Sequence, residues 1–130
     1  MTSKTTREDI LELCGKWQKE LRVDIKQIQI REMKNKWGSC SSKGVLTLNK
    51  ELLSLPSKYV EYVIVHELLH RIVPNHGRTF KTLFYVYLPN WEELHEYLEY
   101  NGKEQNLRRR QALCGNFVAL PRFARSLNSG

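Results

Sequence analysis

The sequence predicts an α+β fold, in which a small sheet rich in hairpins packs with helices. Residues 7–21 place apolar side chains on one face at helical spacing, which predicts an amphipathic helix. Residues 25–31 and 45–49 alternate apolar with polar side chains, a pattern typical of half-buried strands. Residues 56–69 are apolar on nearly every side and predict a central, buried helix.

Cap and proline signals set the expected ends of the two main helices. Thr5 and Glu8 have the spacing of a capping box at the start of the first helix. Pro56 suits the first turn of the buried helix, because a backbone N–H group is not needed there. Pro74 cannot continue a helix, so we expect the buried helix to end before it.

Shorter segments complete the predicted fold. Residues 37–40 are a short candidate strand, and residues 41–44 form the turn that joins it to the strand at 45–49. Residues 78–87 carry aromatic and aliphatic side chains at core spacing and predict a further helix. A last helix is expected over residues 90–102, where it ends at an Asn-Gly pair.

Charge is unevenly distributed along the 130 residues, a length that fits one domain. Because the composition changes near Gly102, we expect a folded domain over residues 1–102 and a basic tail over residues 103–130. The tail holds six basic residues against the single acid Glu104, so it carries +5 of the formal net charge of +7. A basic tail can touch nucleic acid or other polyanions, and the competing interpretation is a solvated, flexible end.

Cysteine usage and hydropathy exclude several classes of protein. Cys14, Cys40 and Cys114 are odd in number, lie far apart and form no CxxC pair, so neither a disulfide framework nor a cysteine–zinc site is expected. The longest nearly apolar run, residues 62–65, is far too short to cross a bilayer. Residues 1–6 contain no apolar signal segment, and we therefore expect a cytoplasmic protein without a membrane partner.

The chemistry of the chain centres on the sequence HELLH at residues 66–70. His66 and His70 are four residues apart, which places both imidazoles on one face of a helix, where they can share one Zn²⁺ ion. Glu67 stands beside that metal and can take a proton from the water that the metal activates. The alternative is a pair of core histidines, but these groups are costly to bury without a metal or other partners.

A catalytic zinc site usually has three protein ligands and one open position, so a third ligand is required. His76 lies six residues after His70, and a chain that turns back after Pro74 could bring it to the metal. We favour His76, because its short tether keeps it near the metal. The competing candidates lie on the last predicted helix: Glu92, Glu93, Glu96 and, more weakly, His95.

Further motifs accompany HELLH in a fixed order: REMKNKWGSCSSKG at residues 31–44, LTLN at 46–49, LP at 55–56, YVIV at 62–65 and NHG at 75–77. Together these segments resemble the YgjP-like metallopeptidase family, which is related to the SprT-like zincins, over residues 7–100. The resemblance implies a compact zincin core with a small, mostly antiparallel sheet and HExxH on the buried helix. It also implies a zinc ion bound by His66, His70 and His76. Glu67 is then the catalytic base.

The stretch WGSC is a candidate for substrate binding through Trp37, Gly38, Ser39 and Cys40. In zincins a sheet edge often lies beside the metal cleft, and an extended peptide can pair with it as an added strand. Gly38 would allow a close approach of the backbone. The competing interpretation is that Trp37 is a core aromatic residue and Cys40 a small buried filler.

The electrophilic partner of the zinc ion is less well defined. A tetrahedral intermediate needs a hydrogen-bond donor beyond the metal. Arg78, Tyr85, Tyr87 or a backbone amide can serve, and the sequence does not choose among them. Core packing is the preferred interpretation of both tyrosines.

These residues predict a zinc metallohydrolase, a metalloendopeptidase that acts on a protein or peptide. One alternative is a metal-dependent nucleoside-triphosphate pyrophosphatase, in which Lys34, Lys36 and Arg78 hold the triphosphate. No glycine-rich phosphate loop supports that alternative. The other alternative is a DNA-associated, SprT-like protease that uses the basic tail. The physiological substrate and the oligomeric state do not follow from the sequence.

Overall fold

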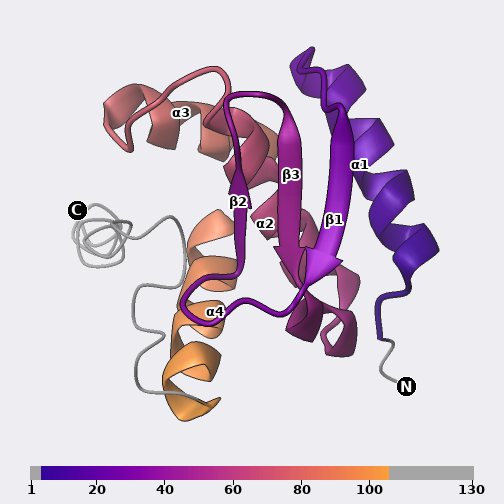
Figure 1. Ribbon diagram of the computed structural model, residues 1–130. Helices are drawn as coiled ribbons and strands as arrows, with labels where there is room; N and C mark the ends of the chain where they lie inside the picture. The colour runs from indigo at the N-terminus through magenta and orange to yellow at the C-terminus, as the bar shows by residue number, and fades with distance from the viewer. Residues whose placement is uncertain (1–3, 106–130) are drawn as a thin grey trace, which may run out of the picture.

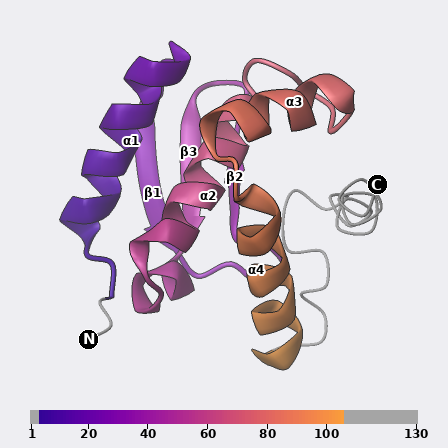
Figure 2. The ribbon, with the colours of Figure 1, turned by 180° about the vertical axis from the view of Figure 1, so that it is seen from behind.

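A three-stranded sheet and four α-helices form residues 4–105, the part of the chain that the computed structural model describes. In order, the elements are α1 (Arg7–Leu21), β1 (Gln27–Arg31), β2 (Gly38–Cys40), β3 (Val45–Asn49), the 3₁₀ helix η1 (Lys50–Ser54), α2 (Ser57–Leu69), α3 (Arg78–Tyr87) and α4 (Trp91–Gln105). The sheet is one layer and α2 crosses behind it (Figure 1). Seen from behind, α1 lies on one side of α2, with α3 and α4 on the other (Figure 2). The predicted α+β class is confirmed.

The sheet is mixed, so the expectation of mostly antiparallel pairing is wrong. Its strand order is β1-β3-β2, with β3 antiparallel to β2 and parallel to β1. The turn at residues 41–44 folds β2 back onto β3 as the predicted hairpin. Residues 32–37 connect β1 to β2 and cross the end of β3, which lies between them. As a result, β1 pairs with the other edge of β3 and runs parallel to it.

Asn49 holds that crossing segment in place. Its side-chain amide donates to the carbonyl of Met33 at 3.0 Å and to the carbonyl of Lys36 at 2.8 Å. Its side-chain oxygen accepts from the backbone N–H of Glu51 at 3.0 Å, which caps η1, a helix that sequence periodicity did not reveal. Asn49 is fully buried, so these bonds are formed away from water.

Helix ends show small differences from the sequence prediction. The cap of α1 is Thr6, which accepts from the N–H of Asp9 and forms a capping box with it, instead of the predicted pair Thr5 and Glu8. Thr5 is buried instead, because its hydroxyl donates to the carbonyl of Leu55 at 2.7 Å. Other ends shift by a few residues: β1 begins at Gln27, and α4 continues to Gln105.

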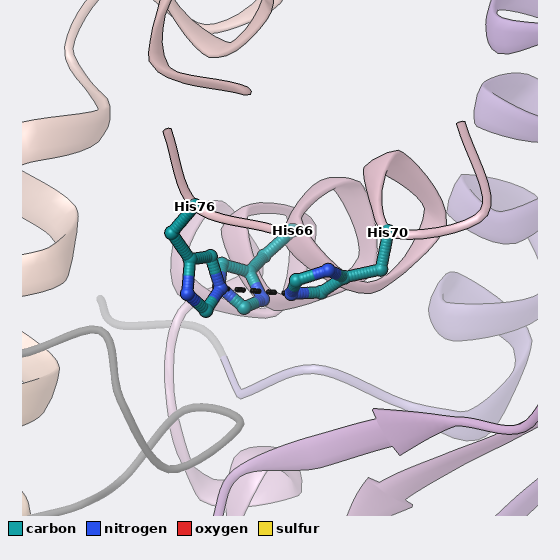
Figure 3. Close-up of side chains that lie close together, drawn as sticks. All are labelled: His66, His70 and His76. Carbon is teal, nitrogen blue, oxygen red and sulfur yellow. Dashed lines mark hydrogen bonds between the residues drawn. The ribbon is translucent and has the colours of Figure 1, made fainter. Parts of the chain in front are cut away.

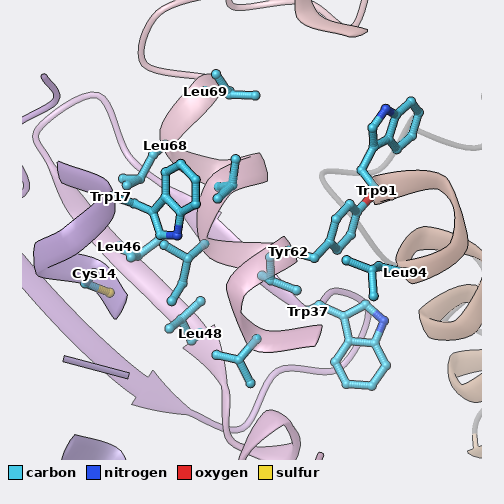
Figure 4. Close-up of a cluster of buried hydrophobic side chains, with 14 of the residues drawn as sticks. Cys14, Trp17, Trp37, Leu46, Leu48, Tyr62, Leu68, Leu69, Trp91 and Leu94 are labelled. Carbon is cyan, nitrogen blue, oxygen red and sulfur yellow. The ribbon is translucent and has the colours of Figure 1, made fainter. Parts of the chain in front are cut away.

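The core lies between the sheet and α2, and α1, α3 and α4 close its sides (Figure 4). The fully buried side chains that fill it come from every helix and from β3, and they include Ile10, Leu46, Leu48, Tyr62, Ile64, Leu68, Phe84 and Leu98. Helix α2 is buried over nearly its whole length, as its apolar sequence predicts. No helix within residues 4–105 is both long and apolar enough to cross a membrane.

The tail predicted at residues 103–130 lies outside the described residues, apart from the last turn of α4. Its proposed contact with nucleic acid therefore stays a prediction from composition.

Candidate active site

Helix α2 presents the first two histidines and the glutamate of HELLH. The side chains of His66 and Glu67, both in the last turn of the helix, are buried in the protein. His70 is the C-terminal cap residue of the helix, and its side chain is half-buried. The rings of His66 and His70 lie 4.9 Å apart between centroids. The four-residue spacing therefore places both imidazoles on one face, as expected.

A tight turn brings His76 back to this pair. The N–H of Val73 donates to the carbonyl of Leu69 at 2.8 Å, Pro74 ends the helical path, and α3 begins after its cap residue Gly77. Nε2 of His76 lies 2.8 Å from Nε2 of His70 (Figure 3). One ring nitrogen from each of the three histidines lies within 4.8 Å of the other two.

Phe80 supports all three imidazoles and was missed as a site residue. Its ring centroid lies 5.3 Å from that of His66, 4.9 Å from that of His70 and 4.9 Å from that of His76. The side chain is fully buried on α3. Its place at core spacing in the sequence marked it as a packing residue, and it is packing that orients the histidine rings.

Burial favours the neutral form of His70 and His76. The pKa of His76 is lowered to about 3, first by desolvation and then by the nearby His66 and His70. Desolvation also lowers the pKa of His70, and hydrogen bonds with the backbone of Pro74 and Val73 partly oppose this effect. A neutral imidazole offers a lone pair, so both side chains are in the form that binds a metal.

Glu67 lies at the junction of the histidines and the cleft. Its carboxylate oxygen is 3.2 Å from Nδ1 of His66, and the side chain is almost fully buried, yet it contributes to the cleft wall. A carboxylate in this position can accept a proton from a group held at the histidines.

The donor set fits a metal ion. Three imidazoles are a common ligand set for zinc, and the chain offers them from three positions that converge on one point. Two nitrogens bound to one tetrahedral zinc ion lie about 3.3 Å apart, so the 2.8 Å between His70 and His76 needs only a small adjustment. Within the described part of the chain, no other group of histidine, cysteine or carboxylate side chains converges in this way.

His70 and His76 open onto a cleft of about 850 Å³, while His66 lies buried behind them. Its walls are formed by Lys36, Ser39, Cys40, Glu67, His70, Pro74, Asn75, His76 and Gly77. Of the four predicted substrate residues, Ser39 and Cys40 therefore face the cleft. Trp37 does not, because it is a buried core side chain, as the competing interpretation held. The amide side chain of Asn75 also lines the cleft, and only its place in the NHG motif could have indicated this.

Gly38 and Cys40 have packing roles in the structure. A Cβ atom at Gly38 would lie 2.9 Å from Cγ1 of Val63, so this glycine lets the sheet approach α2 rather than a ligand. Burial, with Glu67 as a second cause, raises the pKa of the Cys40 thiol to about 11. A thiol at that pKa is a poor nucleophile at neutral pH, which agrees with the role of a small filler.

The competing metal ligands on α4 do not join the histidines. Glu92 accepts a short hydrogen bond from the hydroxyl of Tyr85, while Glu93 and Glu96 are exposed. The pKa of Tyr85 is raised to about 12 by desolvation and by this glutamate. The three glutamates of α4 therefore do not converge with the histidines.

His95 is fully buried, which sequence reasoning did not anticipate. Its Nδ1 lies 2.9 Å from the hydroxyl of Tyr62, and its Nε2 lies 3.8 Å from a carboxylate oxygen of Glu99. Desolvation, with His66 and His76 nearby, lowers the pKa of His95 to about 3. This network joins α4 to α2 one turn before His66.

None of the side chains considered for the electrophilic role lines the cleft. Tyr87 packs edge to face against Trp17 at 5.8 Å between ring centroids, as its core interpretation predicts. Tyr85 is occupied with Glu92, and Arg78 is exposed at the start of α3.

A buried HExxH helix that packs on a small sheet and borders a cleft is typical of the class of zincin-like metallopeptidases. The family model "YgjP-like, metallopeptidase domain" matches residues 1–101. The chain belongs to this family, and it is a metal-dependent peptidase that acts on a peptide or protein substrate.

Solved structures agree with this class. The chain is similar to the metallopeptidase zymogen jannalysin of Methanocaldococcus jannaschii, with 26% identity, a TM-score of 0.66, and coverage of 78% of this chain and 96% of the other. The metallopeptidase zymogen abylysin of Pyrococcus abyssi has the same fold, with 21% identity, a TM-score of 0.63, and coverage of 71% and 93%. No curated protein matched the chain.

Proposed function

We propose that the chain is a zinc endopeptidase in which His66, His70 and His76 hold one zinc ion and Glu67 is the general base. The observation that carries the proposal is the convergence of three imidazole nitrogens within 4.8 Å, next to a buried carboxylate and an open cleft. Zinc is the proposed metal because three neutral imidazoles with an open position are typical of catalytic zinc.

Each side chain has a distinct task in this mechanism. A bound zinc ion would polarise the scissile carbonyl and lower the pKa of its water ligand to about 7. Glu67 accepts the proton of the attacking water and passes it to the leaving amine. Phe80 holds the imidazoles in their common orientation through contacts with all three rings.

Strand β2 supports the choice of an extended peptide as substrate. Among the described strands, β2 is at one edge of the sheet, and Ser39 and Cys40 on it line the cleft. An extended peptide can add to such an edge through backbone hydrogen bonds. Pairing of this kind needs no free terminus, and for this reason we propose cleavage of internal bonds.

One set of proteins tests the proposal: wild type, His76→Ala, Glu93→Ala and Glu67→Gln, each analysed for zinc content and for peptide hydrolysis. We expect one zinc ion per chain in wild type and Glu93→Ala, and a large loss of zinc from His76→Ala. Glu67→Gln should keep its zinc and lose about 10²–10⁴-fold in kcat, because only the proton transfer is removed.

Glu93→Ala is the matched control, since it removes the rival ligand from an exposed site on α4. Zinc loss from Glu93→Ala but not from His76→Ala would refute the ligand assignment. Full activity of Glu67→Gln would refute the general base. A chelator should abolish hydrolysis by wild type, and added zinc should restore it.

A further inference from the structure

Apart from Glu67, the residues that line the cleft come from two chain segments that are free of acidic residues. Residues 33–50 and residues 68–91 contain no aspartate or glutamate. Their basic residues are Lys34, Lys36, Lys43, Lys50, Arg71, Arg78 and Lys81. The body of the chain has a small net charge only because its acids lie elsewhere, mainly on α1 and α4. Positive charge is therefore not confined to the tail.

One of these cations lies in the cleft wall, and three others lie on segments that adjoin it. Lys36 forms part of the wall. Arg78 and Lys81 lie in the first turn of α3, which begins directly after Gly77, a residue of the cleft wall. Arg71 donates to the carbonyls of Ser41 and Ser42 at 3.2 and 2.8 Å, next to the end of β2.

The backbone of Lys36 is fixed relative to the catalytic groups. Its carbonyl accepts from the buried amide of Asn49 at 2.8 Å, so the segment that carries Lys36 is held against the end of β3. The acidic side chain in the cleft wall is Glu67, which is almost fully buried and is needed for proton transfer. Lys36 is therefore the exposed charged side chain of the cleft wall, and a cleft concentrates the field of such a charge.

We propose that the cleft selects peptide segments with aspartate or glutamate close to the scissile bond, and that Lys36 is the specificity-determining residue. This inference rests on the proposed peptidase function. The acidic side chain contacts Lys36, while the peptide backbone pairs with β2. Arg71, Arg78 and Lys81 add attraction at longer range, which accelerates encounter with acidic segments.

An acidic peptide fits these observations better than a nucleotide or a nucleic acid. Of the four cations, Lys36 alone belongs to the cleft wall, so they are not gathered at one point inside it, as a triphosphate would require. No glycine-rich loop supplies clustered backbone N–H groups for phosphate. The edge strand β2 beside them offers backbone pairing, which only a polypeptide can use.

The test uses one peptide sequence with acidic, amide or basic residues on both sides of the scissile bond. For wild type, kcat/KM should be highest for the acidic peptide and should fall as salt is raised. Lys36→Glu should lower kcat/KM for the acidic peptide by about five- to tenfold and raise it for the basic one. The matched control is Lys58→Glu, which changes charge equally at the far end of α2, about 18 Å along the helix from His70, and should leave the preference unchanged.

Binding to Glu67→Gln separates the two proposals, and fluorescence anisotropy of the same peptides measures it. If acidic peptides bind tightest and Lys36→Glu removes this preference, but none is cleaved by wild type, the charge selection stands and the peptidase proposal fails. If all peptides are cleaved with equal kcat/KM, the charge selection fails and the peptidase stands. A third outcome is that ATP or single-stranded DNA binds more tightly than the acidic peptide, with this binding lost in Lys36→Glu. That result would also overturn the proposed selection of acidic peptides.

Discussion

Gly38 determines at the residue scale how closely the sheet approaches the helix that carries the histidines. A Cβ atom there would lie 2.9 Å from Cγ1 of Val63 and 3.2 Å from the carbonyl oxygen of Thr47. Val63 is on α2, one turn before His66 and Glu67. Since β2 lines the cleft and α2 carries His66 and Glu67, this contact helps to set the spacing between the proposed peptide site and the proposed metal site.

We therefore expect Gly38→Ala to lower the free energy of unfolding by about 1–3 kcal/mol, because the methyl group overpacks a filled core. It should also weaken peptide cleavage more than zinc binding. Urea unfolding measures the change in stability. Peptide hydrolysis and zinc titration, compared with each other, measure the second effect.

Gly15→Ala is the control for that substitution. Gly15 lies inside α1, and a Cβ atom there would meet nothing within 4 Å. The change should stabilise the protein by about 0.5–1 kcal/mol through helix propensity. Equal effects of the two substitutions would contradict the close approach at Gly38.

Single residues were predictable where local geometry determines their role. The spacing of His66 and His70 defines a shared helix face at any position in a fold. His95 is the counterexample: its spacing from Trp91 and Leu98 fits the buried face of α4, but its contact with Tyr62 on α2 cannot be predicted from that spacing. Its environment comes from packing between α4 and α2.

At the scale of elements, the segment between β1 and β2 depends on one buried amide. Asn49 donates to two carbonyl groups of that segment and accepts from the N–H of Glu51. Asn49→Ala leaves these buried backbone groups without their partner, so we expect a loss of about 2–4 kcal/mol in the free energy of unfolding. The measurement is urea unfolding of wild type and variant.

Two further variants sharpen this prediction. Asn49→Asp keeps the acceptor but turns a carboxylate toward the carbonyls of Met33 and Lys36, so it should destabilise the fold at least as much as alanine. Asn35→Ala removes an exposed amide from the same segment and should change stability by less than about 0.5 kcal/mol. A small effect of Asn49→Ala would show that the crossing does not depend on it.

Most elements could be predicted, but their pairing could not. Periodicity and turn residues located α1, β3, α2 and α3 at nearly their observed bounds. The parallel contact of β1 with β3 was missed, because alternation of side chains tells which face of a strand is buried and not which neighbour it pairs with. The route of residues 32–37 decides that point.

Across the whole molecule, buried neutral histidines couple stability to pH. Desolvation lowers the pKa of His76 and of His95 to about 3, below the ordinary value of 6.5. Between those values the unfolded chain binds protons that the folded chain refuses. The contribution of these histidines to the free energy of unfolding is therefore fully present above about pH 6.5, and it is lost as the pH falls towards 3.

We expect the free energy of unfolding of the metal-free protein to decrease steadily from pH 7 to pH 5, a window above most carboxylate titrations. Urea unfolding at a series of pH values measures this slope. His95→Leu should have a shallower slope than wild type. A free energy that is unchanged or higher at pH 5 would contradict the buried neutral state.

The sequence alone determined the helices and strands, the shared face of His66 and His70, and the family, because these depend on short-range spacing and on ordered motifs. Only the tertiary structure decided that His76, and not a glutamate of α4, lies beside that pair. It also decided that β1 runs parallel to β3 and that Lys36 lies in the same cleft wall as His70 and His76. These features depend on which distant segments pack together, and the buried contacts of Phe80, Asn49 and Gly38 select that packing.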